Sequence, residues 1–425
     1  MKTARKFLAV LMCAAMIFGA MCVGANAAVG DLYSEGADPF HPFPGYEECD
    51  YSNKTAIGPL HFVLMGDHAR LIFIDFKAEG EIVVPATVEG LPVTEITAPI
   101  NMYFGRHMAV TKVVLPDSVT VIGVAAFNSF VALEEVNIPE GVTCIGSYAF
   151  NDCKMLKKVQ LPQSVKYICS RAFSGCESLK EINIPSGVVT VGAEAFSGTA
   201  FYNDKANWDG NMLVRDGALL AVNDDSVNKF SIGDDIRLVA SDAFGNCGNL
   251  REISIPAGLR YLSYNAFGGT ESLMRFTVDP SNPYYTTDKY GVLYSKDKTV
   301  LVAFPYGFAS VGYNVPNGVK RIETVLQGEY ATLFSLPKSV EYFYDIGDNV
   351  ACLAFDGTKE EFADIEGSEK LLCQIAEGER TVTVINKGDG GRSAIQATLL
   401  KATISVVTII YLPVVKLWSL FLRVS

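Results

Sequence analysis

The repetition of one 23-residue pattern constrains the fold of this chain more than any other feature. Four successive units begin with a short apolar stretch ending in proline, each 23 residues after the last: Val113–Pro116, Val136–Pro139, Val159–Pro162 and Ile182–Pro185. Ala-Phe pairs follow the same spacing from Phe127 to Phe196, and recur at Phe244 and Phe267. A fixed period of this length predicts a solenoid, in which each unit buries its apolar face only against its neighbours.

The unit that begins at Ser174 indicates how each repeat folds. Leu179, Ile182 and Ile184 follow the spacing L-x-x-L-x-L, and the last two alternate as the residues of a strand do. Pro185 has no amide hydrogen to donate, so the strand should end there and the chain should turn. The sequence therefore predicts one short strand per repeat, with the rest of the unit crossing back over the core.

These repeats closely resemble those of the BspA-type leucine-rich repeat family of bacterial and parasite surface proteins, whose unit reads aF-x-x-C-x-x-L-x-x-i-x-i-P-x-x-v-x-x-I-g. The resemblance extends from about Phe62 to Ile385. Residues 80–96 resemble the longer first unit, and residues 354–385, with aromatic Phe355 and Phe362, resemble the closing unit. The resemblance implies a β-rich leucine-rich-repeat solenoid with a curved parallel sheet and short helical or 3-10 turns. It also implies adhesion or cell-cell interaction without catalysis or a cofactor.

Two inserts interrupt the period, and each one predicts a β-hairpin. In residues 208–223 and 290–307, short apolar runs flank polar turn residues. The inserts are either built into the solenoid or project a binding surface. The first is the main interpretation, and Tyr284, Tyr285 and Tyr290, in a loop-like stretch, add some weight to the second, because exposed tyrosines often anchor interfaces.

The outward positions of the predicted strands form the candidate binding surface. Stacked side by side, they would make a mixed-charge strip on the concave face, of the kind that solenoids use to bind protein or glycan. The alternative is a sheet face that is merely solvated. The candidate residues are Lys112, Glu134, Glu135, Asn137, Lys157, Lys158, Gln160, Lys180, Glu181, Asn183, Arg251 and Glu252.

No catalytic or metal-binding motif stands out. The four histidines precede the regular units, and His61 and His68 have no cysteine or acidic pair at a metal-ligand spacing. The sequence contains no G-x-S-x-G, H-E-x-x-H or phosphate-binding glycine loop. The aspartate pairs at 224–225 and 234–235 lack the alternation of an EF-hand loop, which favours solvated turns. We therefore expect no enzyme, metal site or cofactor.

Eight of the ten cysteines follow the expected signal-peptide cleavage site, so they would meet an oxidising compartment. Cys153, Cys176 and Cys247 share one repeat position, which predicts a row of buried thiols. A turn spacing of about 4.8 Å permits a disulfide between Cys153 and Cys176, but their parallel side chains disfavour it. Cys352 and Cys373 are the better disulfide candidates.

The N-terminus predicts a secretory signal peptide. A basic start precedes an apolar run from Phe7 to Val23 and a small-x-small site that would be cut after Ala27. Cys22 would suit a lipoprotein, but Met21 is too bulky for the residue before a lipid-modification site.

The chain's net charge of -12 conceals a more acidic body. Without the signal peptide (+3) and the tail from Lys387 (+4), residues 28–386 carry -19. Such a body would be repelled by phosphate backbones, which excludes nucleic acid as a partner.

The C-terminal tail lies outside the repeat pattern. The 21 residues from Ala402 to Leu422 contain one charge, Lys416, and can span a bilayer. Pro413 and Lys416 count against a span, and the β-branched run at 404–410 would suit a buried strand equally well.

We therefore expect a non-catalytic surface or secreted binding protein that mediates protein-protein, cell-cell or host adhesion through a protein or glycan ligand on a host or bacterial surface. A structural envelope spacer and a surface hydrolase are the alternatives. It would be extracellular, and its tail would anchor it if that segment spans the membrane. The expected segments are the signal peptide (1–27), an N-terminal segment (28–61), a cap with the first repeat (62–109), two arrays (110–200 and 230–278), two hairpin inserts (201–229 and 279–309), degenerate repeats with a C-terminal cap (310–386) and the tail (387–425).

Overall fold

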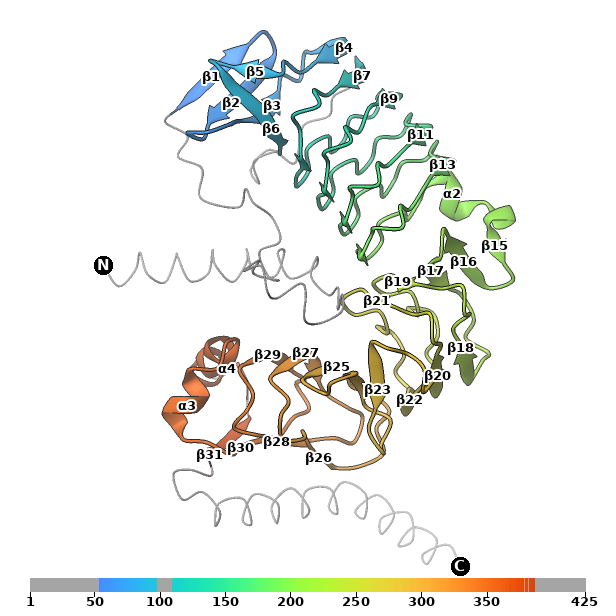
Figure 1. The fold of residues 1–425 in the computed structure, drawn as a ribbon, viewed down its shortest axis with the longest axis vertical. Coiled ribbons are helices and arrows are strands. Elements are labelled where there is room, and N and C mark those ends of the chain that lie inside the picture. The colour runs from blue at the N-terminus through green and yellow to red at the C-terminus, as the bar shows by residue number, and fades with distance from the viewer. Residues whose placement is uncertain (1–52, 98–108, 378, 381, 387–425) are drawn as a thin grey trace, which may run out of the picture. The chain divides into compact units, whose positions relative to one another are not determined.

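The computed structural model describes residues 53–97, 109–377, 379–380 and 382–386. These residues form a leucine-rich-repeat β-solenoid, which confirms the fold predicted from the period (Figure 1). The solenoid divides into two compact units. Unit 1 comprises the chain up to Leu250 together with Pro256–Thr270, and unit 2 comprises Arg251–Ile255 and the chain from Glu271 onward.

The expected signal peptide and the segment from Ala402 to Leu422 lie outside the described residues. Within the described ranges, no helix combines the length and the apolar character needed to cross a bilayer.

One continuous sheet follows the inner side of unit 1 as far as Val191 (Figure 1). Three antiparallel strands begin it, and each later turn adds one short parallel strand. In spatial order its strands are β1 (Lys54–Ile57), β2 (Leu60–Leu64), β3 (Ala69–Ile74), β6 (Leu91–Ile96), β8 (Val121–Ile122), β10 (Cys144–Ile145), β12 (Tyr167–Ile168) and β14 (Thr190–Val191), with β5 (Thr87–Val88) beside β6.

The strands that carry the L-x-x-L-x-L pattern follow the outer side of unit 1 (Figure 1). One sheet contains β4 (Glu79–Val83), β7 (Ala109–Val114) and β9 (Glu135–Val136), and another contains β11 (Lys158–Val159) and β13 (Glu181–Ile182). The sequence predicted that these strands lie on the concave face, and this prediction is wrong for unit 1 (Figure 1). The pairing differs on the two sides: from β3 to β14 the inner strands pair at every turn, whereas the outer strands β9 and β11 belong to different sheets.

The Ala-Phe segments form the remaining side of each turn. The rings of Phe127, Phe150, Phe173 and Phe196 stack with centroids 5.3, 5.3 and 5.8 Å apart. Backbone bonds join the same segments, since the amide of Phe150 donates to the carbonyl of Ala172 at 2.7 Å. The residue two before each ring, such as Tyr148 at φ 60°, has a left-handed backbone. Alternate amides thereby reach the next turn, although the segment is not a regular strand.

The predicted row of buried thiols is confirmed. The sulfurs of Cys153 and Cys176 donate to backbone carbonyls at 3.2 and 3.1 Å, and Cys247 does so at 3.7 Å. Burial and the neighbouring Cys176 raise the pKa of the Cys153 thiol, so it stays protonated. Cys352 and Cys373, the better disulfide candidates from the sequence, are thiols here; Cys352 is buried and Cys373 is exposed.

Both inserts are β-hairpins built into the solenoid. The first contains β15 (Trp208–Asp209), β16 (Met212–Arg215) and β17 (Ala218–Val222), and β17 continues in parallel to β19 (Leu238–Val239) and β21 (Tyr261–Leu262). At its turn, Asp216 accepts the amide of Ile184 at 2.8 Å, which ties the hairpin to the preceding repeat. The short helices α2 (Ala200–Asn203) and η3 (Lys205–Asn207) precede it, and β18 (Lys229–Ser231) follows it.

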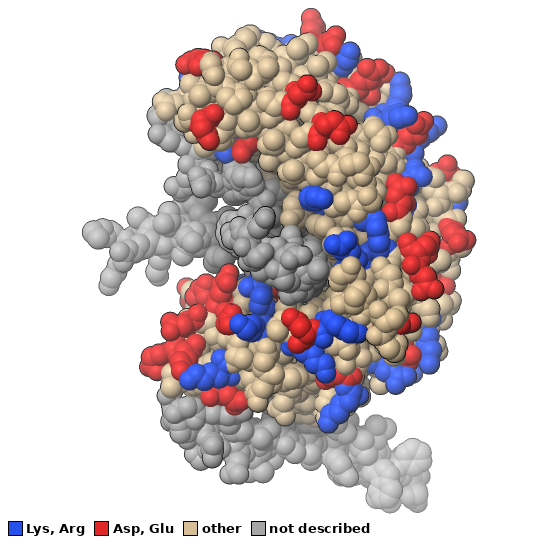
Figure 2. All heavy atoms as spheres, in the orientation of Figure 1, with Lys and Arg blue, Asp and Glu red and all other residues tan. Residues whose placement is uncertain are grey.

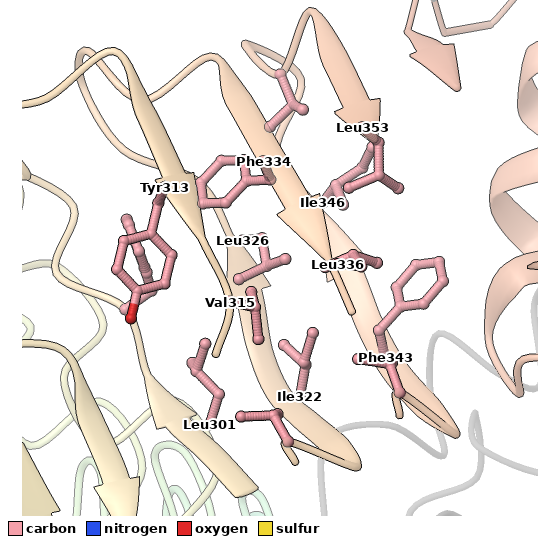
Figure 3. Packing of buried hydrophobic residues seen from close by; sticks show 14 of the residues in the cluster. Leu301, Tyr313, Val315, Ile322, Leu326, Phe334, Leu336, Phe343, Ile346 and Leu353 are labelled. Carbon is pink, nitrogen blue, oxygen red and sulfur yellow. The ribbon is translucent and has the colours of Figure 1, made fainter. Parts of the chain in front are cut away.

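Unit 2 repeats this arrangement around its own core, in which Tyr313, Phe334 and Phe343 lie between two strand rows (Figure 3). Helices α3 (Lys359–Ala363) and α4 (Ser368–Ala376) close it, and Phe355 and Phe362 pack with ring centroids 5.6 Å apart. One row contains the second hairpin. The strands are β20 (Glu252–Ile255) with β22 (Arg275–Val278); β23 (Tyr285–Thr287), β24 (Leu293–Ser295), β25 (Val300–Ala303), β27 (Arg321–Leu326) and β29 (Tyr342–Ile346); and β26 (Gly312–Asn314), β28 (Leu333–Leu336), β30 (Cys352–Phe355) and β31 (Thr383–Asn386).

We expect Phe150→Ala to destabilise the full chain by about 3–5 kcal/mol, because it opens a cavity between two stacked rings. Met155→Ala, in the same repeat but 43% exposed, is the matched control and should change stability by less than about 0.5 kcal/mol. Urea unfolding followed by circular dichroism measures both. Equal losses for the two variants would contradict the role of the phenylalanine stack.

Candidate functional site

The candidate site is a set of charged side chains at the starts of the outer strands in unit 1. Figure 2 shows acidic and basic side chains alternating along this edge. We call this set the outer charge row and define it by eight residues: Glu81, Lys112, Glu134, Glu135, Lys157, Lys158, Lys180 and Glu181. The sequence predicted seven of them, and the structure adds Glu81, which pairs with Lys112.

Ion pairs join successive turns within the outer charge row. Lys112 Nζ lies 3.0 Å from Glu81, Lys157 Nζ lies 2.8 Å from Glu134, and Lys158 Nζ lies 2.7 Å from Glu181. All six side chains remain between 42 and 67% exposed. Pairs with this much contact to water contribute little to stability. Their charges therefore remain available to a partner.

The pairing also shifts the pKa of three members of the row, each in the direction that favours its charged form. Hydrogen bonding to Glu81, and then the charge of that carboxylate, raise the pKa of Lys112. Glu134 raises the pKa of Lys157 in the same way. Hydrogen bonding to Lys158 lowers the pKa of Glu181, so this carboxylate keeps its charge to a lower pH than an isolated one. At neutral pH these groups are fully charged.

Asn137 and Asn183, which the sequence placed on the binding surface, bond to the preceding turn; Asn137 is exposed and Asn183 is half-buried. The side chain of Asn137 accepts the amide of Leu115 at 2.7 Å and donates to its carbonyl at 2.9 Å. Asn183 makes the same two bonds, at 2.7 and 2.9 Å, with Leu161. We call these asparagine clamps, because each side chain replaces a backbone pair between successive turns. Gln160 occupies the same repeat position and is exposed, and it makes no such bond among the described residues.

Arg251 and Glu252 lie at the start of β20 in unit 2, apart from the outer charge row. Arg251 is exposed. Glu252 has a side chain that is 16% exposed and accepts two hydrogen bonds from Arg275, at 2.6 and 2.9 Å. Its carboxylate is thus mainly engaged within the unit.

The three tyrosines of the second insert differ in exposure. Tyr285 is buried at 1% exposure, so the prediction that it anchors an interface is wrong. Tyr284 is half-buried. Tyr290 is 51% exposed, packs edge-on against Phe308 with ring centroids 6.0 Å apart, and has Lys289 Nζ 4.7 Å from its centroid. Of the three, Tyr290 presents the most side-chain surface to a partner.

Two described histidines and one aspartate of the pairs that the sequence singled out contact nearby polar side chains. His61 Nε2 lies 3.0 Å from Asp75, and His68 Nδ1 lies 2.7 Å from Asp67. Asp224 accepts hydrogen bonds from Ser226 and Asn211, and those from Ser226 are the main reason its pKa is lowered. Across the ranges that the structure describes, no group of three or more His, Cys, Asp or Glu side chains is arranged to hold a metal ion. His41 and His107 lie outside those ranges.

The sequence reasoning missed one pair of side chains. The sulfurs of Cys144 and Cys169 lie 4.0 Å apart on neighbouring turns, and both residues are buried. A signal was present in the sequence, because Cys169 stands at the repeat position held by glycine at 123, 146 and 192. The pair is 25 residues apart, one repeat plus two residues, which is the offset that returns a strand side chain to the same face.

Comparisons with known proteins identify similar repeats elsewhere. The profile of the family described as "BspA type Leucine rich repeat region" matches residues 100–205 and 221–327, in six copies. No curated protein matches the chain.

Several solved structures are similar to parts of the chain. A leucine-rich repeat protein of T. pallidum shares 25% identity over 47% of this chain and 81% of its own, with a TM-score of 0.33. A leucine-rich cell surface protein of Faecalibacterium prausnitzii shares 17% identity over 74% and 97%, with a TM-score of 0.27. A leucine-rich repeat protein of Bacteroides ovatus shares 18% identity over 78% and 99%, with a TM-score of 0.29.

We expect Asn183→Ala to destabilise the full chain by about 1–3 kcal/mol, because both backbone groups of Leu161 lose their partner. Gln160→Ala removes a similar volume at the same position of the preceding repeat, and should have an effect of less than about 0.5 kcal/mol. Denaturant titrations of the two variants test this. A loss for Gln160→Ala as large as that for Asn183→Ala would show that the asparagine clamp is not the cause.

Proposed function

The chain belongs to the BspA-type leucine-rich repeat family, and from that premise we propose that it is a non-catalytic protein-binding protein of the cell surface. The proposed role is adhesion to a protein on a host or bacterial surface. Export would depend on the expected signal peptide at residues 1–27. Retention at the membrane would depend on the apolar segment from Ala402 to Leu422.

The outer charge row is the observation that supports this proposal most directly. It presents four carboxylates and four ammonium groups on side chains that the fold leaves mostly in water. Because the two signs balance, the row has no net charge with which to attract a polyanion such as a nucleic acid. The feature that distinguishes the row is the order of its charges from turn to turn. Such a pattern favours a protein partner with a complementary order, since electrostatic complementarity fixes register and rejects wrong partners.

Inverting the order of charges tests the proposal without removing any ion pair. The double swap Glu134→Lys with Lys157→Glu keeps the bond between the two turns and reverses its polarity. Combined with Lys158→Glu and Glu181→Lys, it should weaken saturable binding to extracts of host or bacterial surface proteins at least about 10-fold, and leave the unfolding midpoint unchanged. Surface plasmon resonance on the full chain measures the binding, and thermal unfolding measures the midpoint.

The matched control is the swap Lys320→Glu with Glu341→Lys, an exposed pair 3.1 Å apart in unit 2. This swap should leave binding unchanged. If the swaps in the outer charge row also bind as wild type does, that row is not the binding surface. A chain that binds no extract and sediments with the cell envelope in every variant would support the structural spacer instead. Turnover of a glycan or peptide library would support the hydrolase.

A further inference from the structure

We propose that Cys144 and Cys169 form a disulfide that joins two neighbouring turns of unit 1. The first of these turns carries β9 and β10, and the second carries β11 and β12. We call the contact between them the β9–β11 junction. The inference does not depend on the proposed binding function.

The geometry brings the two thiols together. Their sulfurs are 4.0 Å apart, and both form a small buried cluster with Tyr167. The backbones are already joined, since the amide of Cys169 donates to the carbonyl of Ile145 at 2.9 Å. A disulfide bond is about 2.05 Å long, so each sulfur must approach the other by about 1 Å. Rotation of the two side chains, with a small backbone adjustment, supplies a movement of this size.

Cys169 departs from the repeat at a position where the neighbouring turns have no room for a side chain. A Cβ atom added at Gly146 would lie 2.4 Å from a backbone atom of the adjacent turn, and one added at Gly192 would lie 2.3 Å from such an atom. The turn that contains Cys169 does hold a side chain here, and that side chain contacts Cys144. Cys144 stands at a variable position, where valine, tyrosine and threonine occupy 121, 167 and 190. The side chain that departs from the repeat at 169 therefore meets a cysteine at a position where the neighbouring turns have none.

The contrast with the other cysteines supports the same reading. Cys153 and Cys176 occupy a position where this chain repeats cysteine, and each sulfur donates to a backbone carbonyl. Packing and hydrogen bonding, including the contact between these two thiols, explain that row. The Cys144–Cys169 pair lies at positions where this chain does not repeat cysteine, and its sulfurs are 4.0 Å apart.

The pair also lies at a junction where the outer strands do not pair. On the two flanking junctions the outer strands pair, β7 with β9 and β11 with β13, and an asparagine clamp adds two bonds. At the β9–β11 junction the strands belong to different sheets, and Gln160 replaces the asparagine. A cross-link on the inner side would secure this junction. Loop closure gives a cross-link spanning 25 residues a substantial effect on stability.

The reaction is an ordinary thiol–disulfide exchange. One cysteine, as its thiolate, attacks a low-molecular-weight disulfide such as oxidised glutathione, which releases one reduced thiol and leaves a mixed disulfide. The second cysteine displaces the other half, so two protein thiols are oxidised and one external disulfide is reduced to two thiols. Because both cysteines are buried in the folded turn, the exchange takes place during folding in an oxidising compartment.

Refolding the full chain in a buffer of oxidised and reduced glutathione tests the proposal. Alkylation followed by peptide mass mapping should detect a disulfide-linked pair of peptides containing Cys144 and Cys169. The oxidised chain should unfold about 5 °C higher than the same chain refolded with reductant. Cys169→Gly restores the residue of the neighbouring turns, so it should fold, and it should lose both the linked peptides and the shift. Cys247→Ala should keep both.

Two outcomes would overturn the proposal. In one, Cys144 and Cys169 are both alkylated as thiols after oxidative refolding, or are linked to other cysteines. In the other, the oxidant-dependent shift persists in Cys169→Gly, which would assign the stabilisation to a different cross-link. If the cross-link forms without any shift, the disulfide is real but does not stabilise the junction.

Discussion

Hydrogen bonding between successive turns is the interaction on which the rest of this structure depends. No turn encloses a core of its own, so each one is stable only against its neighbours. The inner strands pair from turn to turn, the Ala-Phe segments donate amides to the following segment, and the outer strands pair on most junctions. The stacked rings of Phe150 and Phe173 and the row of buried thiols follow from the same 23-residue repetition. Identical side chains at equivalent repeat positions contact each other because the backbone brings successive turns into register.

This dependence divides the outward side chains of unit 1 into two groups. Asn137 and Asn183 are polar and lie on the outer strands, but they complete the hydrogen bonding of Leu115 and Leu161 in the preceding turns. The outer charge row does not have this structural role, because its ion pairs are exposed and contribute little to stability. Selection can therefore change the charges from turn to turn without unfolding the array. A binding surface is best built from positions of this kind.

The sequence predicted the repeat, the two hairpins and the row of buried thiols, because each depends on local spacing. It did not predict which side of unit 1 is convex, because curvature depends on how evenly the two strand rows pair along the whole stack. It did not predict that Asn137 bonds to Leu115, because an outward polar residue looks the same in the sequence whether or not it contacts the preceding turn. It misjudged Tyr285, because an insert has no period to indicate which side chains face the core. Cys144 and Cys169 were missed because they deviate from the repeat, and deviations become informative only when the structure shows that two of them meet.

The β9–β11 junction connects stability with the proposed binding surface. It divides the outer charge row, with Glu81, Lys112, Glu134 and Glu135 on one side and the other members on the second side. The ion pair of Glu134 with Lys157 crosses it, and a pair so exposed cannot hold two turns together. At this junction the two turns are joined by the pairing of inner strands β10 and β12 and by the hydrogen bonds between the Ala-Phe segments. A partner that contacts both halves of the row would bind best when the junction is closed. Whatever fixes the junction, including a cross-link on its inner side, would then also preorganise the surface for binding.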